Sequence, residues 1–282
     1  MLWKRKWIAG SIWGLSLGLA QIFHGASVEN SAPPTSKAGP SAPPSLTLSY
    51  SPQATYRVYL PLISRSVCDP IPGASYETFP VISPAPFNVA DNPDYNLLLL
   101  GYVAVNEYKG LVDYGGDFDS RAPQFRFLFG DHRIPVFRNV YKNNGWDWQN
   151  HQRLPPPPGW PAVTIAGFGV ARGEVIYVPD SGYDIGNGFD ALVLYADANQ
   201  ITLKYTGEDS TQHGYTVYIT GICVEPSLLN LYQQWNASGR GRLPAVRGGQ
   251  PIGRAWDVQI DVGVRDNNVF MDPRSRKDWW QR

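Results

Sequence analysis

The sequence predicts a mainly β domain, folded as an antiparallel β-sandwich or an open barrel, with one helical insertion at about residues 225–240. Short segments rich in β-branched and aromatic residues recur along the chain, and most of them alternate apolar with polar positions. Clusters of Gly, Pro, Asp and Asn separate these segments. Helical periodicity is scarce by comparison. Many short strands with so little helix are typical of a single all-β domain.

Eight segments carry the strand pattern. They span residues 122–130, 133–142, 161–170, 173–179, 189–197, 200–206, 215–224 and 257–265. The one helical candidate is "EPSLLNLYQQWNASGR", whose apolar side chains recur at helical spacing. Pro226 near its start and Gly239 after its end stand in the order that helices prefer. Between the strands, Leu154–Pro161 ("LPPPPGWP") predicts a stiff polyproline loop.

The N-terminal fifth of the chain has the pattern of an exported protein. Residues 1–26 combine the basic run Lys4–Lys6 with the apolar stretch Trp7–Phe23, which is the build of a signal peptide and is almost long enough for a membrane anchor. Residues 27–55 are rich in Pro, Ser and Ala, so we expect a disordered linker. The remainder, 56–282, is then a single β-rich domain outside the cytoplasm. Its first residues, Tyr56–Ser66, alternate like an edge strand or a docking segment.

Charge and cysteine content narrow the class of protein further. The chain has 24 basic and 24 acidic residues, and loss of the basic leader would leave a net charge of about −3. No basic patch favours nucleic acid or anionic lipid, so a membrane partner is expected only if the N-terminal segment stays uncleaved. The two cysteines, Cys68 and Cys223, are predicted to form a disulfide, because an even pair in an exported chain usually does.

Motifs for catalysis or metal binding are weak. His132, His151 and His213 lie in separate loops without zinc-ligand spacing, although all three could converge in space. There is no G-x-S-x-G elbow for a nucleophilic serine. Acidic residues do gather in one stretch and could bind a cation: Asp113, Asp117, Asp119 and Asp131. No local motif therefore predicts a hydrolase.

From Gly145 to Pro273, the order and spacing of the segments resemble the lysostaphin-like zinc endopeptidases, which cut peptidoglycan cross-links. The family opens with H-x-G-[IV]-D, and "NNGWD" occupies that place here, with Asn143 at the histidine position and Asp147 retained. "VTIAGFGVARGEVIYV" and "IGNGFDALVLYADANQITLKYTG" are similar to the next two blocks. "GQPIGRAWDVQIDVGVRDNNVFMDP" is similar to the last block, which carries H-L-H in the family.

The resemblance implies the fold of this family over about residues 140–275, but without its catalytic groups. Gly207 stands where the family has a catalytic histidine, Gln259 at the general base and Asp261 at the third zinc ligand. Glutamine cannot take a proton from a zinc-bound water, and Gly207 has no side chain to stabilise an intermediate. Asn143, Asp147 and Asp261 would form an oxygen-only site that suits calcium or magnesium better than catalytic zinc. No cofactor is expected, with calcium as the alternative.

Three functions remain open on this reading. The first is a secreted or surface-tethered, non-catalytic domain that binds cell-wall peptide or glycan, with Trp146, Trp148 and Trp160 either stacking on a sugar or simply packing over the sheet. The second is an active zinc-dependent peptidoglycan endopeptidase with unrecognised ligands. The third is a structural envelope or adhesion protein whose C-terminal "DWWQR" packs onto a neighbour. Peptidoglycan or a polysaccharide is the expected partner in the first two.

Overall fold

The computed structural model describes residues 66–281, all within one unit of the chain. The predicted signal peptide or anchor at 1–26, the linker at 27–55 and the first ten residues of Tyr56–Ser66 lie outside the described residues. Within 66–281, none of the helices is long and apolar enough to cross a membrane.

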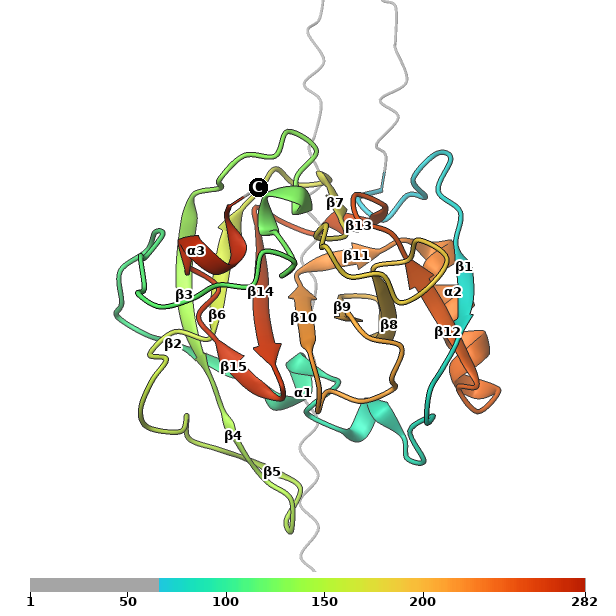
Figure 1. The fold of residues 1–282 in the computed structure, drawn as a ribbon, viewed down its shortest axis with the longest axis horizontal. Coiled ribbons are helices and arrows are strands. Elements are labelled where there is room, and N and C mark those ends of the chain that lie inside the picture. Colours follow the sequence, from blue (N-terminus) through green and yellow to red (C-terminus); the bar gives the residue numbers. More distant parts are fainter. Residues whose placement is uncertain (1–65, 282) are drawn as a thin grey trace, which may run out of the picture. The chain divides into compact units, whose positions relative to one another are not determined.

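The described chain is mainly β, as predicted (Figure 1). Its strands are β1 (Glu77–Pro80), β2 (Tyr102–Ala104), β3 (Phe137–Asn143), β4 (Gly145–Asp147), β5 (Gln152–Leu154), β6 (Ile165–Gly169), β7 (Val175–Tyr177), β8 (Ala191–Ala196), β9 (Gln200–Lys204), β10 (Tyr215–Thr220), β11 (Ile222–Val224), β12 (Arg242–Val246), β13 (Pro251–Ala255), β14 (Gln259–Asp266) and β15 (Val269–Met271). The helices are α1 (Leu97–Leu100), α2 (Pro226–Ala237) and α3 (Arg276–Trp279), with short 3-10 helices η1 (Val89–Asp91) and η2 (Phe125–Leu128).

The strands form one large antiparallel sheet and two small ones. The large sheet runs in the order β1-β12-β8-β9-β10-β14-β6-β3-β2, with β15 paired to one end of β14. The second sheet has the order β11-β13-β7, and β4 and β5 form a separate hairpin. The large sheet begins at β1 and ends at β2 without joining them, so it does not close into a barrel.

One face of the large sheet forms the core together with the second sheet. Ile260 and Val262 of β14 belong to the same buried cluster as Ile176 of β7, Val224 of β11 and Ile252 of β13. Burial of these aliphatic side chains is the main stabilising contribution, at roughly 1.5–3 kcal/mol for each large apolar side chain. Two layers that share one core agree with the predicted sandwich-like class.

The opposite face of the large sheet is polar, and it positions the candidate site. Cross-strand pairing places Thr220 of β10, Asp261 of β14 and Gly167 of β6 side by side on it. Part of this face is covered by α1, whose Leu97 and Leu100 form a small buried cluster with sheet residues. The two faces follow from the pleat, because alternate residues of a strand point to opposite sides.

Helix α2 confirms the predicted insertion. Glu225 caps its first turn, since its carboxylate accepts hydrogen bonds from the main-chain N–H groups of Ser227 and Leu228. Pro226 is the first helical residue, and Gly239 follows the helix at a φ of +87°, where a side chain would be strained.

Seven of the eight predicted strand segments contain strands, but the expectation for residues 122–130 is wrong. Phe125–Leu128 is a 3-10 helix. The run "FRFLF" fits a strand if Phe125, Phe127 and Phe129 share a face, and it fits a helical turn if Phe125, Leu128 and Phe129 do. The second set is the one that the structure buries completely. Phe127 instead lies against His132 at the surface, with ring centroids 4.6 Å apart.

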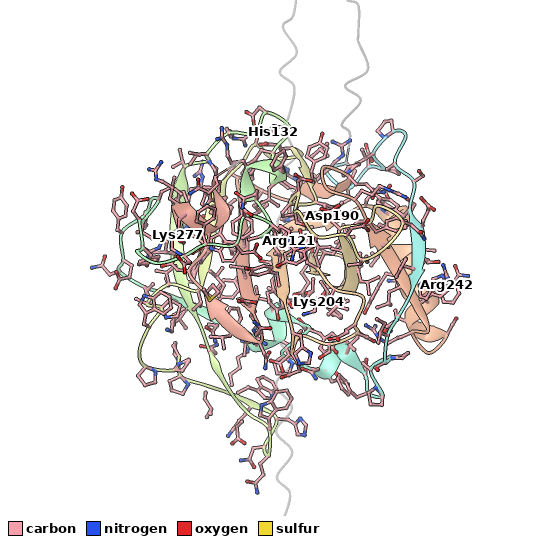
Figure 2. All side chains as sticks on the ribbon, viewed as in Figure 1. Arg121, His132, Asp190, Lys204, Arg242 and Lys277 are labelled. Carbon is pink, nitrogen blue, oxygen red and sulfur yellow. A yellow bond between two sulfur atoms is a disulfide. The ribbon has the colours of Figure 1, made fainter. Side chains whose placement is uncertain are left out.

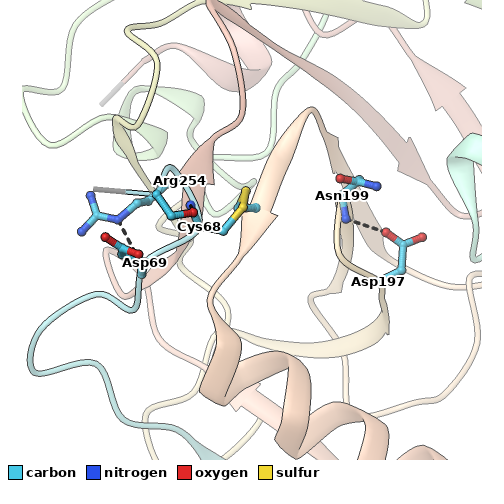
Figure 3. The surroundings of a disulfide bond; sticks show 7 residues. Cys68, Asp69, Asp197, Asn199 and Arg254 are labelled. Carbon is cyan, nitrogen blue, oxygen red and sulfur yellow. Dashed lines mark hydrogen bonds between the residues drawn. A yellow bond between two sulfur atoms is a disulfide. The ribbon is translucent and has the colours of Figure 1, made fainter. Parts of the chain in front are cut away.

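The predicted disulfide between Cys68 and Cys223 is confirmed, with a Cα–Cα distance of 5.2 Å (Figure 3). It ties the N-terminal end of the described chain to β11, across 155 residues of sequence. Closing so long a loop restricts the unfolded chain, which stabilises the folded state by roughly 4–5 kcal/mol. The bond is consistent with the predicted location outside the cytoplasm, where disulfides persist.

The aromatic C-terminus packs within its own domain, which corrects the expectation that "DWWQR" packs onto a neighbour. Trp279 is 1% exposed and stacks on Phe125 with ring centroids 5.6 Å apart. The indole N–H groups of Trp279 and Trp280 donate to the carbonyls of Asp272 and Pro273, at 2.8 and 3.0 Å. Their polar atoms and their rings are therefore both satisfied inside the domain.

Candidate functional site

Gln259 and Asp261, the two positions that the resemblance singles out on β14, lie on the polar face of the large sheet. Three side chains from two other strands of the same sheet join them there. We call this group the Asp261 cluster; it consists of Tyr102 from β2, Asn139 and Tyr141 from β3, and Gln259 and Asp261 from β14. All five are partly exposed. The cluster therefore lies at the surface of the sheet and can be reached from solvent.

A continuous hydrogen-bond network joins the cluster. The Gln259 amide donates from Nε2 to Asp261 Oδ1 (2.6 Å) and to the Tyr141 hydroxyl (2.9 Å). Its Oε1 accepts from Asn139 Nδ2 at 2.8 Å. The Tyr102 hydroxyl donates to Asp261 Oδ2 at 2.8 Å and also lies 3.1 Å from Thr220 Oγ1. Gln259 thus fixes the carboxylate on one side and Tyr102 fixes it on the other.

Gly167 forms the floor under the cluster. It pairs with Asp261 on one neighbouring strand and with Asn139 on the other. A Cβ atom at this position would lie 2.5 Å from Gln259 Nε2 and 3.0 Å from Asp261 Oδ1. Only glycine therefore allows the amide of Gln259 and the carboxylate of Asp261 to lie directly against the sheet. A glycine inside a strand often marks such a close approach by other groups.

An irregularity in β3 aims two cluster side chains at this floor. The register between β3 and β6 shifts between Phe137, which pairs with Phe168, and Asn139, which pairs with Gly167. Phe137 is buried in the core, whereas Asn139 and Tyr141 face the other side. An extra residue in a strand reverses the alternation of its side chains, and such bulges often re-aim residues beside functional sites.

The electrostatics of the cluster are unfavourable for a carboxylate. Burial raises the pKa of Asp261, and the hydrogen bonds from Tyr102 and Gln259 only partly oppose that effect. Burial, followed by the charge of Asp261, also raises the pKa of the Tyr102 and Tyr141 hydroxyls. Both hydrogen-bonding partners of Asp261 are neutral groups. A carboxylate whose pKa is raised by burial at an accessible surface is a candidate for a functional role.

The other expected ligand positions lie on separate elements. Asn143 ends β3, and its amide donates to the carbonyl of Asn144 at 2.9 Å. Asp147 ends β4, where its carboxylate accepts from the main-chain N–H groups of Gln149 and Asn150 and so caps the hairpin turn. Gly207 follows β9, and its carbonyl accepts from Ile82 N–H at 2.8 Å. The structure thus brings together Gln259 and Asp261, and no described contact joins Asp147 or Gly207 to them.

The three tryptophans proposed as ligand contacts also occupy separate surroundings. Trp146 packs against the small apolar cluster beneath α1, with its indole N–H buried and unpaired. Trp148 is exposed after β4, and Trp160 is exposed with its ring in a T-shaped contact with Tyr114. Trp148 and Trp160 keep the free ring surface that a sugar would need, whereas the ring of Trp146 is largely used in packing.

Each histidine sits in a different environment. His132 lies against Phe127, His151 lines a cavity of about 360 Å³ with Asp91, Leu99 and Trp146, and His213 Nδ1 is 3.1 Å from Glu208. Within residues 66–281, no group of three or more His, Cys, Asp or Glu side chains is arranged to hold a metal.

The acidic stretch is dispersed as well, because each of its members has its own contact. Asp113 pairs with Arg276 and Asp131 with Arg133, while Asp119 accepts from the Tyr183 hydroxyl. The main chain of Asp117 accepts from Lys277. These contacts engage the four residues separately, so the cation site expected from this stretch gains no support from its geometry.

Buried basic side chains hold loops in place. Lys204, marked in Figure 2, is fully buried and donates to the carbonyls of His213 and Gly214. Burial lowers its pKa to about 8, with nearby acids only partly opposing this. Lys142 likewise donates to the carbonyls of Gly159 and Pro161 and thereby fixes the polyproline loop. Their geometry is that of a loop anchor, since neither ammonium group is open to a ligand.

Tyr102, Asn139 and Tyr141 are cluster members that the sequence did not reveal. The segment 133–142 predicted a strand but not the register shift that turns Asn139 toward Gln259. A usable signal lay in "IAGFG", because two glycines within one strand indicate a close approach by other groups.

Comparison with protein-family models, with curated proteins and with solved structures finds no match for this chain. The geometry of the Asp261 cluster is therefore the basis for the functional argument. The cluster offers one carboxylate, two carboxamides and two phenol groups on an accessible sheet surface. Such a set can donate and accept hydrogen bonds, but it contains no base paired with a nucleophile.

Proposed function

We propose that this domain binds a cell-wall peptide or glycan on the Asp261 cluster without cleaving it. The observation that carries the proposal is that Asp261 is partly buried and held in place by neutral donors alone. Such a carboxylate lowers the stability of the folded domain. A ligand that donates hydrogen bonds to it would offset that loss.

The free hydrogen-bonding capacity of the cluster matches sugars and peptides. An ionised carboxylate has about four acceptor positions, and the described contacts of Asp261 use two of them. The Tyr141 hydroxyl accepts from Gln259, which leaves its own proton for an acceptor on the ligand. Sugar hydroxyls and peptide amides supply donors and acceptors together, so they complement both groups.

The chemistry of the cluster favours binding over hydrolysis. Gln259 cannot act as a general base at neutral pH, and its amide nitrogen is already hydrogen-bonded to Asp261. The likeness to lysostaphin-like endopeptidases adds a class of ligand, since those enzymes act on peptidoglycan. We therefore infer a secreted or surface-tethered binding domain that retains the substrate surface of such an enzyme and lacks its catalytic side chains.

Co-sedimentation with purified peptidoglycan, and separately with insoluble polysaccharide, tests this proposal. We expect the wild-type chain to sediment with one of them, and Asp261→Asn and Tyr141→Phe to lower the bound fraction at least five-fold. Tyr108→Phe is the matched control, because Tyr108 is an exposed tyrosine (66%) outside the cluster. Equal binding by all four proteins would refute the proposal. Release of soluble fragments that a chelator abolishes would show instead a zinc-dependent endopeptidase.

A further inference from the structure

A second polar site lies near the disulfide, at the N-terminal end of the described chain. A cavity of about 610 Å³ opens there between the segment that follows Ser66 and the turn after β6. Its walls are formed by Ser66, Val67, Asp69, Pro70, Pro72, Arg172, Gly173 and Arg254. Figure 3 shows Arg254 and Asp69 beside Cys68. The cavity belongs to neither the Asp261 cluster nor the core.

The guanidinium of Arg254 is held in a fixed position at this cavity. Its Nε donates to the carbonyl of Asp69 at 3.3 Å, and its Nη1 donates to the carbonyl of Gly173 at 3.1 Å. Its backbone pairs with Cys223 in the second sheet, and the disulfide links Cys223 to Cys68. Both acceptors are neutral carbonyls, so these contacts orient the cation without neutralising its charge.

Arg172 brings a second positive charge to the same cavity. It is exposed, and its guanidinium carbon lies 6.0 Å from the ring centroid of Trp256, itself 51% exposed. The neighbouring acid Glu174 is engaged elsewhere, because it pairs with Arg133 at 2.6 Å and accepts from the main-chain N–H of Ala171. Arg172 is therefore free to turn toward a ligand.

We propose that this cavity binds a single anionic group, a carboxylate or a phosphate. The residues that line it include two arginines and one acid, Asp69, so the walls carry one net positive charge. Planar guanidinium groups bind carboxylate and phosphate oxygens through paired N–H donors, and one of the two is already oriented. The exposed ring of Trp256 offers an apolar surface for the rest of the ligand beside Arg172. This inference does not depend on the function proposed for the Asp261 cluster.

Titration of the full chain with inorganic phosphate and, separately, with acetate tests the site by calorimetry and amide chemical shifts. We expect binding in the millimolar range, with the largest shifts near Arg172, Gly173 and Arg254. Arg172→Gln should weaken it at least five-fold, and the fold should survive because Arg172 makes no buried contact. Arg276→Gln is the control, since it removes one equally exposed charge elsewhere.

Two further comparisons define the chemical class of the ligand. Phosphate bound more tightly than acetate would assign the site to phosphate groups, and the reverse to carboxylates. Benzoate should bind at least three-fold more tightly than acetate in the wild type and lose that advantage in Trp256→Ala. The Asp261→Asn variant should bind both anions like the wild type, which separates this site from the cluster. The proposal is overturned if neither anion binds, or if Arg172→Gln and Arg276→Gln behave alike.

Discussion

Two of the buried or partly buried aspartates of the domain, Asp209 and Asp261, have opposite kinds of partner. Asp209 is completely buried and faces Arg240, which donates to its two carboxylate oxygens from Nε and Nη2, each at 2.7 Å. It also accepts the main-chain N–H of Ala85 at 2.8 Å. Asp261 is less buried, yet its two partners are the neutral groups of Tyr102 and Gln259.

We infer from this difference that Asp209 serves the fold and that Asp261 is kept for binding, as proposed above. A charge that serves the fold is matched by an opposite charge and by enough donors, because an isolated buried charge is costly. Arg240 also donates to the carbonyl of Leu194, so the pair ties a loop and the end of α2 to the sheet. No such tie depends on Asp261, whose contacts stay within the polar face. The loss of stability caused by Asp261 is explained if a ligand completes the hydrogen bonds of this carboxylate.

The largest expected effect is at Asp209. Arg240→Ala leaves this carboxylate buried without its partner, so we expect the free energy of unfolding to fall by about 3–5 kcal/mol. Urea denaturation monitored by tryptophan fluorescence measures it. Arg276→Ala is the matched control, because it breaks an exposed pair with Asp113 and should cost less than about 1 kcal/mol. Equal losses in the two variants would mean that burial does not distinguish the pairs.

The fold class was predictable because it depends on the local composition of short segments and on the turn residues between them. Segments rich in aliphatic and aromatic residues, such as 189–197 and 215–224, form strands. Strands that carry proline were missed: β12 contains Pro244 and β13 begins with Pro251. Proline weakens the prediction of a strand because it lacks the N–H group that pairs with the neighbouring strand. At an edge or at the first residue of a strand, that N–H group is not required.

The site was only half predictable for a similar reason. Gln259 and Asp261 stand two residues apart on one strand, so sequence alone places them on one face. Tyr102 reaches them from 157 residues earlier than Gln259, and that contact depends on the order of strands in the sheet. Asn139 depends on the register shift in β3, which no alternation pattern reveals. Long-range pairing and strand irregularities thus carried the information that was missing.

A smaller effect is expected at the glycine floor. Gly167→Ala places a Cβ 2.5 Å from Gln259 Nε2, so the amide must leave its position and the network must break. We expect a loss of about 1–3 kcal/mol in unfolding free energy, typical of overpacking, and a loss of ligand binding of at least five-fold. Gly115→Ala is the control, since nothing lies within 4 Å of its Cβ position. Unchanged binding in Gly167→Ala would show that the position of Gln259 is unimportant.

Asp261→Asn is expected to change stability least, and it tests the comparison between Asp209 and Asp261 most directly. Asparagine keeps the shape, accepts from Gln259 through its oxygen and donates to Tyr102, whose hydroxyl can turn to Thr220. We expect unfolding free energy at pH 7 to stay equal or rise by up to about 1 kcal/mol, because a desolvated charge is removed. Ligand binding should nevertheless fall, since the carboxylate is lost.

The pH dependence of stability decides whether that explanation of Asp261→Asn holds. Burial raises the pKa of Asp261 above its ordinary 3.8, so the folded protein keeps this proton to a higher pH than the unfolded chain does. The stability linked to it is complete below about pH 3.8 and is lost as the pH rises through the folded value. Subtracting the Asp261→Asn profile from the wild-type profile between pH 3 and 7 should reveal a decline of this sign. A difference that increases with pH would mean that the carboxylate stabilises the fold, and the contrast with Asp209 would disappear.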